Sequence, residues 1–394
     1  MSNRNEIPNW GPSLKREIEG LPAVQQIRGS SGCPTYLVGG AVRDLLRGVE
    51  PVDLDIAIDG PLAPVLEGVE GEVTSFPDFE TASVSPPGGG RIDLARTRRE
   101  SYVSPGSLPE VEPAPIEEDL ARRDFSINAM AVPLDDAAVL IDPFGGREDL
   151  QRGVIRVLHQ DSLSDDPTRA FRAARYAARL GLEVDEATSR QIEQVDLETI
   201  SEDRLASEIA LCAREECASG SLTKAAEWGL VSLPSEGSSL LHDICNLLER
   251  EPWKSYLEAL GMEGAIVLAA VPAAGKRTTD TGAIQSARRI AAEQPADPAA
   301  IATIARRCDP VSLILARALG ASWLDAWPEE LQATEISISG DDLLEAGVPA
   351  GPLIGIGLGA ALAEKLNDPS TDRDGELESA LEACRRAGWK EGPS

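Results

Sequence analysis

The stretch 36–58, YLVGGAVRDLLRGVEPVDLDIAI, restricts the possible folds more than any other part of the sequence. A short apolar strand enters Gly39-Gly40, a helical segment follows, and a second apolar strand comes after a turn. Side chains two apart on a strand share a face, so Asp53 and Asp55 project side by side. Two adjacent carboxylates repel each other, and a pair of divalent metal ions would offset that repulsion. Because a glycine turn that leads into a helix suits phosphate oxygens, the stretch indicates nucleotide chemistry.

The overall composition limits the class of protein. A chain of 394 residues is long enough for two or more domains with sizeable cores. Hydrophobic residues make up 42% of it, yet no apolar run approaches the roughly 20 residues that a membrane-spanning helix needs. The N-terminal residues lack the charged-then-apolar plan of a signal peptide. We therefore expect a soluble cytoplasmic protein that does not bind a membrane.

Cysteine and histidine residues are too few and too scattered for the familiar metal sites. The six cysteines form no CxxC pair, which argues against a zinc ribbon and leaves buried or free thiols as the expectation. The two histidines, His159 and His242, exclude a histidine-rich metal site and the histidine set of a metal phosphohydrolase.

The formal net charge of −29 opposes a nucleic-acid partner, since long-range electrostatic steering repels a polyanion. A solubilising surface, or adaptation to salt that screens the repulsion, would account for the acidity. The distribution of charge matters more than its sum. Residues 169–179 contain four arginines and no acidic residue, which is compatible with a local RNA-binding patch.

Strand and helix signals alternate up to about residue 160. The spacing of apolar residues predicts a leading helix over 14–27 before the strand–helix–strand unit. Further strands are expected at 73–76, 82–84, 91–96, 138–141 and 156–158. A long polar connection with several prolines covers 100–120, and an amphipathic helix is expected over 121–132.

The pattern becomes helical from Asp165-Asp166-Pro167 onward. An aspartate at the cap followed by a proline predicts a helix that runs to about Gly181. Residues 185–394 are rich in alanine, leucine and glutamate at helical spacing, with one short strand signal at 336–338. The sequence therefore predicts an α+β fold, in which a mixed β-sheet with helices is followed by an all-helical remainder.

Four sequence blocks occur in a fixed order: LVGGAVRD with DLD, RRDFSINAMA, DPFGGREDL and DDPTRAFRAARYAARLG. Together they resemble the class II tRNA nucleotidyltransferases and bacterial poly(A) polymerases, the family of the CCA-adding enzymes. The resemblance is dense over 34–182 and weaker in ISEDRLASEI at 200–209 and in the tail at 338–358. It implies a catalytic nucleotidyltransferase head, a helical neck that selects the nucleotide, and a helical body and tail that bind tRNA. The corresponding ranges are 1–158, 159–220 and 221–394.

In the first block, the resemblance implies that Gly40 and Arg43 bind the triphosphate. Asp53 and Asp55 would be the catalytic pair that holds Mg²⁺, which lowers the pKa of the attacking 3′-hydroxyl and stabilises the leaving pyrophosphate. Asp93, on a neighbouring strand, is either a third carboxylate near the metal ions or a surface aspartate.

The resemblance also assigns nucleotide binding to Arg123 and to the helix of the fourth block. Asp166 and Arg169 would share one face of this helix, and Arg172 and Arg175 would continue the stripe, free for phosphate or RNA contacts. Cytosine and adenine both present an exocyclic amino donor beside a ring-nitrogen acceptor. An aspartate acceptor beside an arginine donor would therefore accept these two bases and reject guanine and uracil.

The implied reaction is Mg²⁺-dependent transfer of CMP and AMP from CTP and ATP to the tRNA 3′ end, with release of pyrophosphate and without a protein partner. Three products remain open: complete CCA, the terminal A alone, or a poly(A) tail. The long connection at 100–119 resembles the flexible segment associated with A addition, which disfavours an enzyme that adds only CC. The alternatives are a non-catalytic RNA-binding relative, which the intact candidate residues disfavour, and a small-molecule nucleotidyltransferase, which does not need the helical tail.

Overall fold

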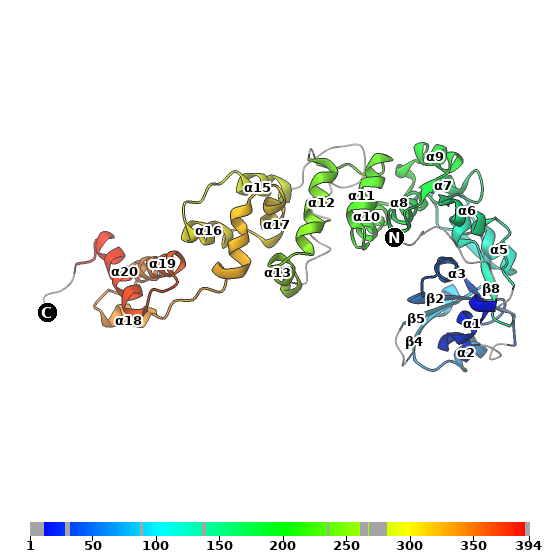
Figure 1. The fold of residues 1–394 in the computed structure, drawn as a ribbon, viewed down its shortest axis with the longest axis horizontal. Helices are drawn as coiled ribbons and strands as arrows, with labels where there is room; N and C mark the ends of the chain where they lie inside the picture. Colours follow the sequence, from blue (N-terminus) through cyan, green and yellow to red (C-terminus); the bar gives the residue numbers. More distant parts are fainter. Residues whose placement is uncertain are drawn as a thin grey trace. The chain divides into compact units, whose positions relative to one another are not determined.

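The computed structural model describes residues 12–27, 32–86, 90–135, 139–234, 236–260, 267 and 282–390. The chain divides into two compact units, Met1–Leu230 and Val231–Ser394 (Figure 1). Strands and helices alternate in the first part of the N-terminal unit. Beyond residue 184, the described residues contain helices, turns and loops only. The predicted α+β fold, a mixed sheet followed by helices, is confirmed.

A six-stranded mixed sheet organises the N-terminal unit, in the order β3-β4-β5-β2-β1-β8. Its strands are β1 (Thr35–Val38), β2 (Asp53–Ile58), β3 (Glu72–Phe76), β4 (Thr81–Ser85), β5 (Arg91–Arg96) and β8 (Ala131–Pro133). Neighbouring strands are antiparallel except β2 and β5, which are parallel. Along β2, Leu54 and Ile56 are buried whereas Asp53 and Asp55 are exposed. The two aspartates therefore share a face, as the strand period predicts.

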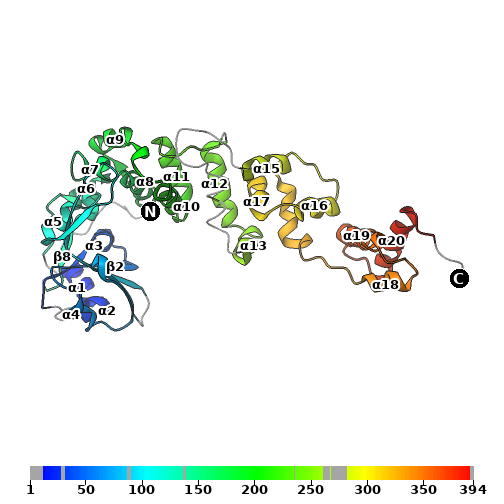
Figure 2. The ribbon, with the colours of Figure 1, turned by 180° about the vertical axis from the view of Figure 1, so that it is seen from behind.

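Short helices accompany the sheet. They are α1 (Pro12–Gly20), α2 (Pro22–Ile27), α3 (Gly40–Leu46), α4 (Ala63–Leu66), α5 (Ile116–Ala121) and α6 (Gly146–Arg152). Both views show α1 and α2 together beside the sheet (Figures 1 and 2). The single helix predicted over 14–27 is wrong, because the chain breaks at Leu21 and Pro22 begins a second helix. Proline suits a first helical turn, where its missing N–H has no intrahelical partner to lose.

The segment between β5 and β8 contains structure that the sequence did not indicate. The connection predicted over 100–120 includes an antiparallel hairpin of β6 (Arg98–Ser101) and β7 (Glu110–Pro113), and then α5. The helix predicted over 121–132 is wrong. This region forms a turn, the 3₁₀ turn η2 (Ser126–Asn128) and β8. Its apolar side chains are buried because β8 joins the sheet beside β1.

Two further strand predictions also differ from the structure. No strand covers 156–158: the strand nearby is β9 (Val154–Ile155), which pairs in parallel with β10 (Glu183–Val184). Of the strand predicted over 138–141, residue 138 lies outside the described residues. Ile141 makes a single isolated bridge with Ala131 instead of a ladder.

Helices complete the N-terminal unit. They are α7 (Ser162–Asp165), α8 (Thr168–Leu180), α9 (Glu186–Glu193), α10 (Glu202–Ala213) and α11 (Ala218–Glu227). Helix α8 ends at Gly181, whose φ of 66° is left-handed, so the predicted end of this helix is confirmed. Its predicted start is two residues early, because Asp166 has extended backbone angles.

The described part of the C-terminal unit is helical. Its helices are α12 (Gly237–Leu248), α13 (Trp253–Leu260), α15 (Gly282–Ala291), α16 (Pro298–Ala305), α17 (Pro310–Ala318), α18 (Gly340–Glu345), α19 (Pro352–Asn367) and α20 (Arg373–Arg386). The strand predicted at 336–338 is wrong. The backbone N–H groups of Ser337 and Ile338 donate to the buried carboxylate of Glu376, at 2.6 and 3.3 Å, instead of to another strand. Among the described helices, none is both long enough and apolar enough to cross a membrane.

Candidate functional site

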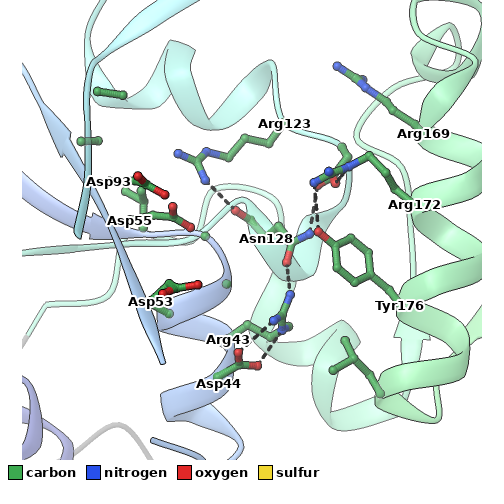
Figure 3. Close-up of a pocket in the computed structure, with 18 of the residues that line it drawn as sticks. Arg43, Asp44, Asp53, Asp55, Asp93, Arg123, Asn128, Arg169, Arg172 and Tyr176 are labelled. Carbon is green, nitrogen blue, oxygen red and sulfur yellow. Dashed lines mark hydrogen bonds and ion pairs between the residues drawn. The ribbon is translucent and has the colours of Figure 1, made fainter. Parts of the chain in front are cut away.

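A cavity of about 950 Å³ lies in the N-terminal unit, and Figure 3 shows part of its wall. The residues that line it include all the predicted site residues except Arg175, namely Gly40, Arg43, Asp53, Asp55, Arg123, Asp166, Arg169 and Arg172. Arg175 does not reach the cavity wall. Its guanidinium forms an ion pair with Glu215 at 2.7 Å, so it is not free in this structure, and its contact with phosphate or RNA stays a prediction.

Three aspartates from two parallel strands face the cavity (Figure 3). In the register of β2 and β5, Asp55 lies opposite Asp93, and Asp53 precedes Asp55 by one strand period. One carboxylate oxygen of Asp93 is already hydrogen-bonded within the protein: its Oδ1 accepts from Arg91 Nε at 2.8 Å and from Ser83 Oγ. The described residues contain no ready-made cluster of three or more His, Cys, Asp or Glu side chains for a metal ion.

The electrostatics of Asp55 reflect this crowding of carboxylates. Although Asp55 is open to the cavity, the protein atoms around its carboxyl partly desolvate it and raise its pKa, and the negative charges of Asp93 and Asp53 raise it further. The guanidinium groups of Arg123 and Arg43 oppose the rise without cancelling it. A carboxylate whose charged form is disfavoured in this way gains from a nearby cation, so the donor set fits a divalent metal ion.

The turn between β1 and α3 brings the backbone close to the charged side chains. Gly39 has a φ of 66°, which favours glycine. A Cβ built at Gly39 would lie 2.8 Å from Arg123 Nη1 and 3.4 Å from Asp55 Oδ2. At Gly40, where φ is ordinary, the nearest atom would be Arg43 Nη2 at 3.4 Å. The resemblance assigned triphosphate binding to Gly40, which stays a prediction, whereas the position whose backbone favours glycine is 39.

Arg43 extends from α3 and is almost fully buried, with 3% of its surface exposed. Its Nε and Nη2 donate to the two carboxylate oxygens of Asp44, at 2.9 and 3.0 Å. Its Nη1 donates to Asn128 Oδ1 at 2.7 Å. These bonds fix the plane of the guanidinium and present it to the cavity near Asp53 and Asp55.

Arg123 is oriented by a buried acid from the preceding helix. Asp119 lies four residues earlier on α5 and accepts from Arg123 Nη2 at 3.0 Å and from Arg122 Nη2 at 2.9 Å. Burial on its own would raise the pKa of Asp119, but the charges and hydrogen bonds of Arg123 and Arg122 hold it below its usual range. Asp119 therefore stays ionised and keeps both guanidinium groups in place.

Asp166 and Arg169 do not share one helical face as predicted. Asp166 precedes α8 in an extended conformation, with φ −136° and ψ 94°, because a residue before proline is forced out of the helical region. Its Oδ1 accepts hydrogen bonds from Thr168 Oγ1 at 2.7 Å and from Arg204 Nη2 at 3.1 Å. Its Oδ2 accepts none from the described part of the chain. Arg169 is buried and donates to Ser162 Oγ and to the carbonyl oxygen of Arg122.

Arg172 lines the cavity but is also paired within the protein, so it is not free in this structure, and its contact with phosphate or RNA stays a prediction. Its Nε donates to Asp124 Oδ2 at 2.8 Å, and its Nη2 donates to the hydroxyl of Tyr176 at 2.9 Å. Burial of Asp124 on its own would raise the pKa of that carboxyl, but Arg172 and Asn128 lower it. The negative charge of Asp124 raises the pKa of Arg172.

Sequence reasoning missed several residues that hold the site together. The chief ones are Asn128, Tyr176, Arg204 and Asp119. The spacing of Asp119 from the two arginines, three and four residues along a helix, is a signal that could have found it. Asn128 contacts Arg43 across 85 residues of sequence and carries no local signal.

Comparison with known proteins shows what the chain is similar to. Residues 35–156 match the family described as "Poly A polymerase head domain". An A-adding tRNA nucleotidyltransferase of Geobacter sulfurreducens is 30% identical over 88% of this chain, which corresponds to 45% of that protein. A CC-adding tRNA nucleotidyltransferase of Deinococcus radiodurans is 48% identical over 37% of this chain and 41% of its own length. The chain spans about half the length of the curated relatives it matches, or less.

The similarity to solved structures extends over nearly the whole chain. The structure of a CCA-adding enzyme in its apo form II superposes with a TM-score of 0.76 at 28% sequence identity. The match covers 95% of this chain and 96% of that one. The arrangement of a mixed sheet followed by helices is therefore also the fold of a CCA-adding enzyme.

Proposed function

We propose that this chain, whose residues 35–156 match the poly(A) polymerase head domain, is a tRNA nucleotidyltransferase, an enzyme that adds nucleotides to tRNA. The proposed reaction transfers CMP and AMP from CTP and ATP to the 3′ end of tRNA and releases pyrophosphate. We place it in the cytoplasm, where these substrates occur. The range 1–158 would carry the chemistry, 159–220 the choice of nucleotide, and 221–394 the contacts with tRNA.

One observation carries this proposal: a single cavity contains groups suited to a metal ion, to a triphosphate and to a base. Asp53 and Asp55 would hold Mg²⁺, and the raised pKa of Asp55 fits this role, because a cation favours the charged form of the carboxyl. When bound, Mg²⁺ would supply the positive charge that activates a 3′-hydroxyl and stabilises pyrophosphate as it leaves. Arg43 and Arg123, both held by neighbouring side chains, would orient the triphosphate.

Base selection would depend on Asp166 and Arg169 at another part of the same wall. Arg204 and Thr168 occupy Oδ1 of Asp166, so Oδ2 is left to accept a hydrogen bond from the exocyclic amino group of cytosine or adenine. Arg169 is anchored through both terminal nitrogens, and its Nε donates to no described group. It would donate to the ring nitrogen beside that amino group. Guanine and uracil instead present a carbonyl acceptor beside a ring N–H donor. The carboxylate would then face an acceptor and the guanidinium a donor, so neither hydrogen bond would form.

Incorporation assays with purified protein test the reaction directly. Three tRNA transcripts, which end at the discriminator base, after C and after CC, are each incubated with Mg²⁺ and labelled CTP or ATP alone. A CCA-adding enzyme extends the first two with CTP and the third with ATP. If no transcript is extended with any nucleotide, the proposal is wrong.

Addition of the terminal A alone is the second candidate, because a relative that matches 88% of this chain is named an A-adding tRNA nucleotidyltransferase. It predicts extension only of the transcript that ends in CC, and only with ATP. A poly(A) polymerase would instead extend all three transcripts with many adenylates. A non-catalytic RNA-binding protein would extend none and would fail to bind ATP with Mg²⁺.

A further inference from the structure

A closed ring of five polar side chains joins α3 to α8 along the cavity wall (Figure 3). Arg43 donates to Asn128 at 2.7 Å, and the Asn128 amide donates to Asp124 Oδ1 at 3.0 Å. Arg172 donates to Asp124 Oδ2 at 2.8 Å and to the Tyr176 hydroxyl at 2.9 Å. A cation–π contact between Tyr176 and Arg43 closes this ring of side chains: Cζ of Arg43 lies 5.4 Å from the centroid of the Tyr176 aromatic ring.

Tyr176 is the member at which the two arginines meet. The guanidinium of Arg172 lies 5.6 Å from the centroid of the same aromatic ring, and that of Arg179 lies 5.3 Å from it. Phe125 packs edge-on against the ring at 5.9 Å and limits its rotation. Three cations around one aromatic ring repel one another, and a carboxylate partner of each offsets this repulsion. The partners are Asp44 for Arg43, Asp124 for Arg172 and Glu215 for Arg179.

The ring also connects parts of the chain that are far apart in sequence. Arg43 follows the glycine turn, Asp124 and Asn128 precede β8, and Arg172 and Tyr176 lie on α8. Arg43, Asn128 and Asp124 have at most 7% of their surface exposed, whereas Tyr176 is half-buried and lines the cavity. A tyrosine that only filled the core would not need to face the cavity with three guanidinium groups around it.

We propose that Tyr176 is a positioning residue for the triphosphate site. Its aromatic face holds the Arg43 guanidinium in the orientation that binds phosphate, while its hydroxyl holds Arg172 against Asp124. The inference rests on the proposed function, because it takes Arg43 to bind the triphosphate. Tyr176 itself contacts no phosphate in this proposal and acts through Arg43.

The first test measures the affinity of the full chain for ATP with Mg²⁺, without tRNA, by calorimetry. Tyr176→Leu removes the aromatic ring and should weaken ATP binding about tenfold, which corresponds to the loss of one partly desolvated cation–π contact. Tyr176→Phe keeps the ring and should bind ATP within about twofold of the parent chain. Tyr256→Leu is the matched control. That residue packs edge-on against Trp253 in the C-terminal unit, with the same T-shaped geometry, and it is not among the residues that line the cavity.

The second test asks whether Tyr176 acts through Arg43. In an Arg43→Ala background, Tyr176→Leu should cause no further loss of ATP affinity, because the group it positions is gone. Additive losses would overturn the proposal, and so would unchanged ATP binding by Tyr176→Leu in the parent chain. If Tyr176→Leu does not fold, as judged by circular dichroism, Tyr176→Phe remains decisive, because a tenfold loss in that variant would show that the aromatic face is not what holds Arg43.

Transfer kinetics separate this inference from the proposed function. The positioning role predicts a raised KM for ATP and CTP alike in Tyr176→Leu, with kcat nearly unchanged because Asp53 and Asp55 are untouched. If the parent chain transfers nucleotides and this split is absent, only the role of Tyr176 is wrong. If the parent chain neither binds ATP nor extends tRNA, the proposed function fails first.

Discussion

Asp55 on β2 lies directly opposite Asp93 on β5, in the register of the two parallel strands of the sheet. Side chains opposite one another on paired strands lie close together, and like charges in such positions are destabilising. The fold therefore concentrates negative charge at the place where the sequence predicted a metal ion. This relationship has measurable consequences for both activity and stability.

Replacement of Asp55 by Asn should abolish transfer and at the same time stabilise the protein at pH 7. Since the pKa of Asp55 is raised in the native state, this state binds more protons than the unfolded state between the ordinary value of 3.8 and the raised value. Stability is thus lost as the pH rises through that interval. We expect Asp55→Asn to unfold at a higher temperature than the parent chain at pH 7, with the difference vanishing below pH 3.8.

Thermal unfolding at several pH values, with EDTA present, checks this prediction. The rise in unfolding temperature should be small, because the Asp55 side chain is also exposed. Added Mg²⁺ should stabilise the parent chain and leave Asp55→Asn unaffected. A parent chain that is the more stable of the two at pH 7 in EDTA would contradict the electrostatic argument.

The two adjacent glycines of the turn should respond differently to alanine. In Gly39→Ala, the new methyl group meets the Arg123 guanidinium at 2.8 Å and the backbone keeps a φ that favours glycine, so activity should fall by about 100-fold. In Gly40→Ala, the methyl group meets only Arg43 at ordinary contact distance, and activity should stay within about threefold. Steady-state rates with saturating ATP distinguish the two. Equal losses at both positions would show that the turn is not constrained as described.

Arg204 should matter for the choice of base and not for the chemical step. Its Nη2 donates to Asp166 and its Nη1 to the backbone carbonyl of Gly106, so it fixes the carboxylate that would face the base. Arg204→Gln should raise incorporation of UTP and GTP relative to CTP and ATP by about tenfold. Competition assays with mixed nucleotides measure this ratio. Arg190→Gln, which breaks an exposed ion pair with Glu186, serves as the control and should change nothing.

Glu376 should be important for the stability of the C-terminal unit. Its side chain is fully buried, accepts the backbone N–H groups of Ser337 and Ile338, and lies 3.5 Å from Lys365 Nζ. Glu376→Ala removes the acceptor of the buried Ile338 N–H and of the Ser337 N–H, together with the anionic partner of Lys365, at a cost of about 3 kcal/mol in the free energy of unfolding. Urea denaturation followed by circular dichroism measures the loss. Glu378→Ala, an exposed neighbour on α20, should cost less than about 0.5 kcal/mol.

The strand–helix–strand unit and the end of α8 could be predicted because their signals are local. Alternating burial along β2 follows from its own residue order, and the glycine at 181 ends its helix without help from distant residues. The region 121–132 could not be predicted in this way. Its apolar residues are buried on all sides, so their spacing carries no helical or strand period, and only the pairing with β1 decides the outcome.

The candidate site shows the same division between local and distant information. The identities of the acidic pair and of most arginines followed from the sequence blocks, because those residues lie within short motifs. Their partners did not follow. Asn128 reaches Arg43 across 85 residues and Arg172 reaches Asp124 across 48, and no pattern of spacing connects such pairs. Asp166 lies outside the predicted helix, because the proline that follows it disfavours the helical conformation.

Three arginines of the cavity already have anionic partners: Asp44 for Arg43, Asp119 for Arg123 and Asp124 for Arg172. An incoming phosphate thus enters an exchange, in which it competes with a carboxylate of the protein for each guanidinium. A small singly charged anion gains little binding free energy when it replaces one of these carboxylates. A triphosphate with its accompanying cation can bind several guanidinium groups at once. The same pairing keeps buried cations from being stranded when the cavity is empty. Selectivity for a polyvalent ligand is in this sense built into the resting state of the protein, before any base is read.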